Sequence, residues 1–204
     1  MSYTNRFDFS KVKGSDWAHV AANQVLISHS DLEVYTTAAG ISPSGVVHFG
    51  NFRDIVTAHL VREALREKGK KARLIFSWDN FDRFRKVPAG IPESFVEHIG
   101  KPLTKIPDPF NCCASYAEHF QKPFMEAMKT LGIEIEYRDQ TNLYESGIYD
   151  EKIFQALKDR EKIADILLSF MSDKAKGEKG IDPDEYRKNY YPISIYSRFT
   201  GKDV

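Results

Sequence analysis

Residues 40–51 read Gly-Ile-Ser-Pro-Ser-Gly-Val-Val-His-Phe-Gly-Asn, and this stretch decides the fold. Before it, residues 33–39 are rich in Val, Tyr and Thr, which favours a β-strand. After it, residues 52–68 carry apolar side chains at helical spacing behind Asn51, which is a good N-cap. Residues 73–78 then predict a buried strand. Together these segments predict a βαβ unit, whose two strands pair in parallel.

The turn itself has the residues of a phosphate-binding site. A helix N-terminus offers unpaired backbone N–H groups and a partial positive charge. Gly40, Gly45 and Gly50 let the backbone approach a ligand closely. His48 and Asn51 add two side chains that can donate hydrogen bonds to phosphate oxygens. The alternative is a turn that merely needs glycines, and the residues alone leave both open, because neither the GxxxxGK[ST] nor the GxGxxG pattern is present.

The rest of the chain predicts an α/β protein with a long irregular insertion. Residues 80–110 hold five prolines and little periodicity, which is typical of a functional or disordered loop. Pro123 is expected to kink or split the helix in which it lies. The other patterns predict helices over 16–28, 111–131 and 150–171, strands over 132–137 and 191–196, and a mobile linker over 172–188.

Composition argues against several classes of protein, namely basic nucleic-acid modules, membrane proteins and secreted proteins. Lys plus Arg and Asp plus Glu number 29 each among 204 residues, which argues against a dedicated basic nucleic-acid module but leaves RNA possible as a partner. No apolar stretch approaches the ~18–20 residues that cross a membrane, and residues 1–8 lack the apolar core of a signal peptide. We therefore expect a cytoplasmic protein without a membrane partner. Because Cys112 and Cys113 are adjacent and the histidines are scattered, we expect no metal site.

Three segments resemble a known family. Residues 42–45 (Ser-Pro-Ser-Gly) followed by residues 48–51 (His-Phe-Gly-Asn) resemble the first signature of class I aminoacyl-tRNA synthetases, the "HIGH" motif. Residues 77–88 and 100–109 resemble the class I form of lysyl-tRNA synthetase, and the resemblance covers most of residues 16–201. It implies a Rossmann-type parallel sheet that activates lysine with ATP and transfers it to tRNA(Lys), with Mg²⁺ on the phosphates.

The resemblance also implies roles for residues of the turn. His48 and Asn51 would act on the ATP phosphates and ribose side, as the catalytic pair. Gly50 would let the adenine approach, because a Cβ there would block it. Gly40 and Ser42 would lie against the amino acid as well as the nucleotide. The nucleotide site would be completed by the remaining motif residues, Pro43 and Gly45.

Acidic and basic residues after residue 78 complete the expected site. Asp79 and Asp82 could hold the ammonium groups of lysine, although Asp79 could instead cap a turn. A basic cluster beside three aromatic residues suits the end of a tRNA, or is a solvated loop over a small aromatic core. The basic residues are Arg83, Arg85 and Lys86, and the aromatic residues are Trp78, Phe81 and Phe84.

The chain also departs from the family pattern. Ser197 and Thr200 stand where family members often have the two thiols of a Cys-x-x-Cys-Gly motif, so we expect no zinc. Asn80 stands where a second Asp is frequent, which removes a negative charge beside the expected lysine pocket. No segment resembles the second class I signature, a Lys-Met-Ser-Lys-Ser-like loop. We therefore expect the N-terminal part of a larger enzyme that is inactive as this chain alone.

The expected organisation is an N-terminal helical segment over 1–30, the N-terminal half of a catalytic domain over 31–171, and a linker with a C-terminal extension over 172–204. We expect a monomer. Two other functions stay open at this point: a different HIGH-type nucleotidyltransferase, and a paralogue that binds tRNA or lysine without catalysis.

Overall fold

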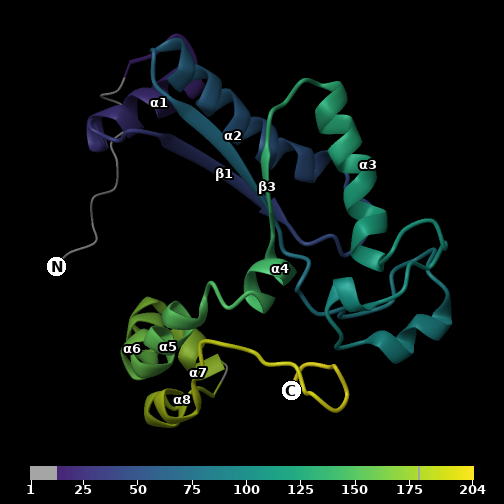
Figure 1. Cartoon of the computed structure of the whole chain (residues 1–204). Helices are drawn as coiled ribbons and strands as arrows, with labels where there is room; N and C mark the ends of the chain where they lie inside the picture. Colours follow the sequence, from purple (N-terminus) through teal and green to yellow (C-terminus); the bar gives the residue numbers. More distant parts are fainter. Residues whose placement is uncertain (1–12, 179) are drawn as a thin grey trace.

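The structure is a computed structural model that describes residues 13–178 and 180–204, so residues 1–8, used above to exclude a signal peptide, lie outside it. Figure 1 shows a sheet with helices packed against it, and a separate group of helices toward the C-terminus. Within the described ranges, no helix is long and apolar enough to span a membrane. The elements, in chain order, are α1 (Trp17–Ser28), β1 (Tyr35–Ile41), α2 (Phe49–Glu67), β2 (Ala72–Trp78), two 3₁₀ turns (Glu93–His98 and Leu103–Lys105), α3 (Tyr116–Thr130), β3 (Glu136–Asp139), α4 (Gln140–Glu145), α5 (Asp150–Lys158), α6 (Arg160–Phe170), α7 (Asp173–Glu178) and α8 (Pro183–Asn189).

The three strands form one parallel sheet in the order β1-β2-β3, which confirms the predicted βαβ unit and the α/β class. Gly40 of β1 pairs with Ser77 of β2, and Trp78 of β2 pairs with Asp139 of β3. All three strands therefore end at the same edge of the sheet. In open α/β sheets, ligands bind at this carboxyl edge.

Helices α2 and α3 pack on the same face of the sheet (Figure 1). Strand β2 directs Leu74, Phe76 and Trp78 into that face, and each is almost fully buried. Phe124 of α3 stacks on Phe76 with ring centroids 5.1 Å apart, and Ile55 of α2 completes the contact. Because burying a side chain of this size contributes about 1.5–3 kcal/mol, these residues hold the sheet and its crossovers together.

Several predicted boundaries were wrong. Strand β1 continues to Ile41, so Gly40 lies within the strand and the turn begins later. Helix α2 begins at Phe49, and its N-cap is His48 rather than Asn51. Helix α3 runs through Pro123 without splitting, and Phe124 and Met128, which follow the proline, are buried against the sheet, where their packing offsets the cost of the proline.

The predicted helix over 150–171 is two helices, α5 and α6, which meet at Asp159. Arg160, the first residue of α6, donates hydrogen bonds to the carbonyl oxygens of Lys188 and Tyr190 at 3.0 and 3.1 Å. Its guanidinium also lies 4.7 Å from the centroid of the Tyr191 ring. These contacts with residues 188–191 hold the start of α6 in place. They could not be predicted from the helical periodicity of residues 150–171, because they involve a later segment of the chain.

The C-terminal predictions also need correction. The segment expected as a linker contains α7 and α8, and Arg187 of α8 forms an ion pair with Asp165 of α6. The strand expected over 191–196 is reduced to one isolated bridge between Tyr196 and Asp203. The insertion over 80–110 is irregular as predicted, apart from its two 3₁₀ turns. It has its own apolar cluster with the start of α3, made of Phe84, Leu103, Ile106, Tyr116, Ala117 and Phe120.

Histidine 19 joins α1 to the C-terminal end of α2, and its contacts predict a pH-dependent stability. Its Nδ1 lies 2.8 Å from Asp16 and its Nε2 lies 2.9 Å from Glu67. The hydrogen bond to Glu67, followed by that to Asp16, raises the pKa of His19 above its usual value. The stabilisation should therefore be complete below the unfolded pKa of about 6.5 and should be lost as the pH rises through the folded-state pKa.

The measurement is thermal unfolding of this chain and of His19→Gln between about pH 6 and pH 9. The gap between the two melting temperatures should be widest at the acidic end and should close toward the alkaline end. Taking the difference removes the contributions of His59 and His98, whose pKa values are lowered by burial. A gap of constant size across this range would contradict the prediction.

Candidate functional site

The expected site residues gather at the carboxyl edge of the sheet. The backbone N–H of Asp79 donates to the carbonyl oxygen of Ile41 at 3.0 Å, which joins the residue after β2 to the start of the turn after β1. Helix α4 begins directly after β3 at Gln140, next to the same edge. The structure thus brings together the turn before α2, Asp79 and the start of α4.

The mouth of helix α2 is held by two reciprocal hydrogen bonds. The backbone N–H of Gly50 donates to Nδ1 of His48 at 3.1 Å, and the backbone N–H of His48 donates to Oδ1 of Asn51 at 3.2 Å. Since Nδ1 accepts a hydrogen bond, the proton of the neutral imidazole sits on Nε2. His48 is exposed, so Nε2–H is available as a donor at a helix N-terminus, where anions bind.

At two positions of this segment, steric contacts explain why the residue is glycine. A Cβ at Gly50 would lie 2.9 Å from Cε1 of His48, so the absence of a side chain lets the imidazole fold over the first turn of α2. A Cβ at Gly40 would lie 3.0 Å from both Cβ and the carbonyl oxygen of Ser77 on the neighbouring strand. By contrast, a Cβ at Gly45 would meet nothing within 4 Å. Gly40 and Gly50 are therefore required by contacts within the protein, whether or not a ligand approaches them.

The turn before α2 is held by a hydrogen bond from Tyr116, a residue that the sequence analysis did not single out. The hydroxyl of Tyr116, at the start of α3, donates to the carbonyl oxygen of Ser44 at 2.8 Å. Tyr116 is fully buried, and burial raises its pKa to about 12, so the hydroxyl stays a donor. Pro43 is also fully buried, while Ser42 is half-buried. Helix α3 thus fixes the phosphate-type turn, and no local pattern in residues 40–51 indicates it.

Asp79 and Asp82 face a common groove of about 960 Å³. Asp79 is half-buried, and the hydroxyl of Ser77 donates to its Oδ1 at 2.8 Å. Asp82 is exposed, and its backbone N–H donates to the carbonyl oxygen of Asp79 at 3.2 Å. Both carboxylates can therefore reach a cationic ligand in the groove. Its other walls include Phe81, Arg85, Gln140, Tyr149, Lys152 and Tyr196.

Asn80 does not face the groove, contrary to the expectation that it changes the charge of a lysine pocket. Its side chain is fully buried, and its Nδ2 donates to Oδ2 of Asp139 at 2.6 Å. Its Oδ1 accepts from the backbone N–H and the hydroxyl of Thr141 at 2.9 and 3.1 Å. An aspartate here would place a fully buried carboxylate against that of the half-buried Asp139, which is costly. Asn80 therefore ties β2 to the start of α4.

The expected patch of cations and aromatic rings is only partly present. Trp78 and Phe84 are each 2% exposed and belong to different apolar clusters, so neither ring can stack on a nucleotide. Arg83 is engaged in an ion pair with Asp203. Arg85 lines the groove and Lys86 is exposed, and neither has an ion pair within the part of the chain that the structure describes.

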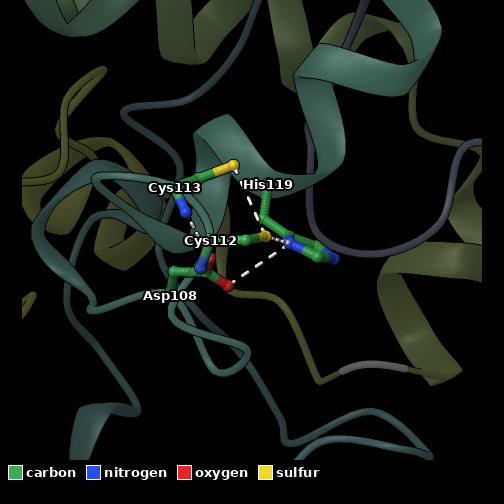
Figure 2. Close-up of side chains that lie close together, drawn as sticks. All are labelled: Asp108, Cys112, Cys113 and His119. Atoms are coloured by element: carbon green, nitrogen blue, oxygen red, sulfur yellow. Dashed lines mark hydrogen bonds and ion pairs between the residues drawn. The ribbon is translucent and has the colours of Figure 1, made fainter.

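A second group of side chains could hold a metal ion, contrary to the expectation from the adjacent cysteines. Figure 2 shows Asp108, Cys112, Cys113 and His119 directed toward one another. One ligand atom from each lies within 4.8 Å of all the others. Sγ of Cys112 is 3.1 Å from Nδ1 of His119, which is 3.3 Å from Oδ1 of Asp108. Two sulfurs, one imidazole and one carboxylate are four ligands of the types that bind zinc, in the number that a tetrahedral site needs.

The carboxylate of this group is fixed before any ion binds. Burial raises the pKa of Asp108, but the backbone N–H groups of Phe110, Cys112 and Cys113 and the thiol of Cys112 donate to it and outweigh burial, so that its pKa falls to about 2. Asp108 is therefore charged at neutral pH. The signal was present in the sequence as Asp-x₃-Cys-Cys-x₅-His, but it required the loop to fold back onto the first turns of α3.

Comparison with known proteins identifies the family. A family model described as tRNA synthetases class I (K) matches residues 15–204. The chain belongs to this family. The class I (K) chain is 42% identical over 188 residues to the lysine–tRNA ligase of Thermococcus kodakarensis, which covers 92% of the chain and 34% of that relative. It is 36% identical over 193 residues to the lysine–tRNA ligase of Treponema pallidum, and this match covers 94% of the chain and 35% of the relative.

The family membership confirms the resemblance inferred from residues 42–51, 77–88 and 100–109, and with it the Rossmann-type fold class. The chain spans about a third of the length of the curated relatives it matches. The matched range contains the turn before α2, Asp79 and the group of four possible metal ligands.

Proposed function

We propose that the intact protein carrying this chain is a lysine–tRNA ligase, and that this chain supplies its ATP site and part of its lysine site. The observation that carries the proposal is the Nε2–H donor of His48 at the mouth of α2, on the same sheet edge as the carboxylate of Asp79. The names of the relatives support the choice of lysine and tRNA as substrates.

In the first step, a carboxylate oxygen of lysine attacks the α-phosphorus of ATP, and the bond to the oxygen bridging to the β-phosphate breaks. Lysyl-adenylate forms and pyrophosphate leaves. Negative charge grows on the non-bridging oxygens, where Nε2–H of His48 and the backbone N–H groups at the start of α2 can stabilise it. Residues 40–51 contain no carboxylate, so Mg²⁺ would be held mainly by the phosphate oxygens.

The lysine would lie between the end of β1 and the groove. Asp79, with Asp82 nearby, offers a charged partner for an ammonium group, and Gly40 and Ser42 at the end of β1 would lie against the amino acid. A tRNA hydroxyl then attacks the lysyl carbonyl carbon, and AMP leaves. Arg85 and Lys86 would contact the tRNA end. Residues 31–171 would form the catalytic half that this chain contributes.

Lysine-dependent exchange of pyrophosphate into ATP by the intact protein tests the proposal. We expect exchange with lysine and at least about 100-fold less with amino acids that lack a side-chain ammonium, because an unpaired buried charge is costly. Exchange driven by a different amino acid would identify another nucleotidyltransferase. Binding of tRNA or lysine without exchange would identify a non-catalytic paralogue. Either result contradicts the proposal.

A further inference from the structure

Four side chains form one continuous hydrogen-bond chain that ends on Asp79. The hydroxyl of Tyr149 donates to Oε1 of Gln140 at 3.0 Å. Nε2 of Gln140 donates to the hydroxyl of Ser77 at 2.7 Å, and that hydroxyl donates to Oδ1 of Asp79 at 2.8 Å. The four residues come from the end of β2, the start of α4 and the residue before α5. All but Ser77 line the groove.

The direction of this chain follows from the chemistry of its members. An ionised carboxylate can only accept, so Ser77 must donate its single proton to Asp79. Ser77 can then only accept from Gln140, which makes the amide nitrogen the group facing Ser77. The amide oxygen of Gln140 is left to accept from Tyr149. Hydrogen bonds aligned in this way strengthen one another, and each holds the next group in place.

Each end of the chain is packed in place. The ring of Tyr149 lies edge-on to that of Tyr144 at 4.9 Å between centroids, and Tyr144 stacks on Phe81 at 5.3 Å. Next to the Asp79 end, Ser77 lies directly opposite Gly40, where a side chain would come within 3.0 Å of it. Ser77 is therefore confined between β1 and Gln140. Because Ser77 is held in place, its hydrogen bond to Oδ1 favours one orientation of the Asp79 carboxylate in the groove.

We infer that Gln140 and Tyr149 are positioning residues for amino-acid recognition, acting through Ser77 on the carboxylate of Asp79. The inference rests on the proposed function, in which Asp79 holds an ammonium group of lysine. By fixing one oxygen of Asp79, the chain directs the other oxygen at the ligand. The alternative is that the chain only joins α4 to the sheet, which would affect stability without selecting a substrate.

The experiment compares variants of the intact protein in lysine-dependent ATP–pyrophosphate exchange. Tyr149→Phe removes the first donor and should raise the KM for lysine about 3- to 10-fold. Gln140→Glu keeps the shape but cannot donate to Ser77, and should raise the same KM about 10- to 100-fold. The KM for ATP should stay unchanged. Tyr186→Phe is the matched control, because it removes a tyrosine hydroxyl from α8 and leaves the hydrogen bonds from Tyr149 to Asp79 intact.

A second set of variants separates positioning from folding. In an Asp79→Asn background, Tyr149→Phe and Gln140→Glu should have no further effect on the KM for lysine, because they act through the carboxylate. Effects that multiply in that background, or that raise the KM for ATP equally, would overturn the inference. So would an active Asp79→Asn protein with a normal KM. If the wild-type protein shows no lysine-dependent exchange, the proposed function fails first and the inference falls with it.

Discussion

Replacing His48 by alanine in the intact protein should lower the rate of lysine activation about 10²- to 10³-fold and leave the KM for lysine nearly unchanged. The reason is the tautomer favoured by Gly50, whose N–H donates to Nδ1 and leaves the proton of the exposed imidazole on Nε2. Such a donor is most valuable when charge grows on the α-phosphate, whereas the proposed lysine site is at Asp79. ATP–pyrophosphate exchange, measured over a range of lysine concentrations, provides both quantities.

The difficulty is that His48 also caps α2, and losing an N-cap costs about 1 kcal/mol of stability. His48→Asp separates the two roles, because aspartate is a good cap but can only accept hydrogen bonds. We expect His48→Asp to restore the melting temperature and to be at least as slow as His48→Ala. If His48→Asp restores the rate as well, or if His48→Ala weakens lysine binding as much as it slows activation, then His48 has no role at the phosphate.

The second large effect concerns the group of four possible metal ligands. We expect this chain to bind one zinc ion with Asp108, Cys112, Cys113 and His119 as ligands. Zinc at 100 times its dissociation constant would add about 2.7 kcal/mol to the free energy of unfolding, which raises the melting temperature of a chain of this size by roughly 5–10 °C. Thermal unfolding with and without a chelator measures this shift, and cobalt substitution reports thiolate ligands through its absorption spectrum.

His119→Gln should abolish the shift, while His98→Gln is the matched control, since His98 lies in the insertion that also carries Asp108 but is outside the group. The ion would tie the loop before α3 to the first turns of that helix, where Tyr116 supports the turn at Ser44. Loss of the ion should therefore weaken the ATP site indirectly. A chain that retains no zinc after gel filtration, with a melting temperature unaffected by chelator, would contradict the assignment.

Local patterns account for the predictions that held. Three short-range signals located β1, α2 and β2: the Val, Tyr and Thr residues of 33–39, the apolar spacing of 52–68 and the apolar run within 73–78. The same signals misplaced the N-cap, because histidine is not a usual capping residue and Asn51 is. In the structure Asn51 accepts from the backbone of His48, one turn earlier than expected.

By itself, the sequence determined the parallel βαβ unit, the glycine turn at its carboxyl edge and the family, because each depends on residues close together in the chain. Only the tertiary structure decided how that turn is supported and what faces the groove. Gln140 meets Ser77 across 63 positions, Tyr116 meets Ser44 across 72, and Asn80 meets Thr141 across 61. No periodicity encodes such contacts, because they exist only after β1, β2 and β3 have paired and α3 has packed against them.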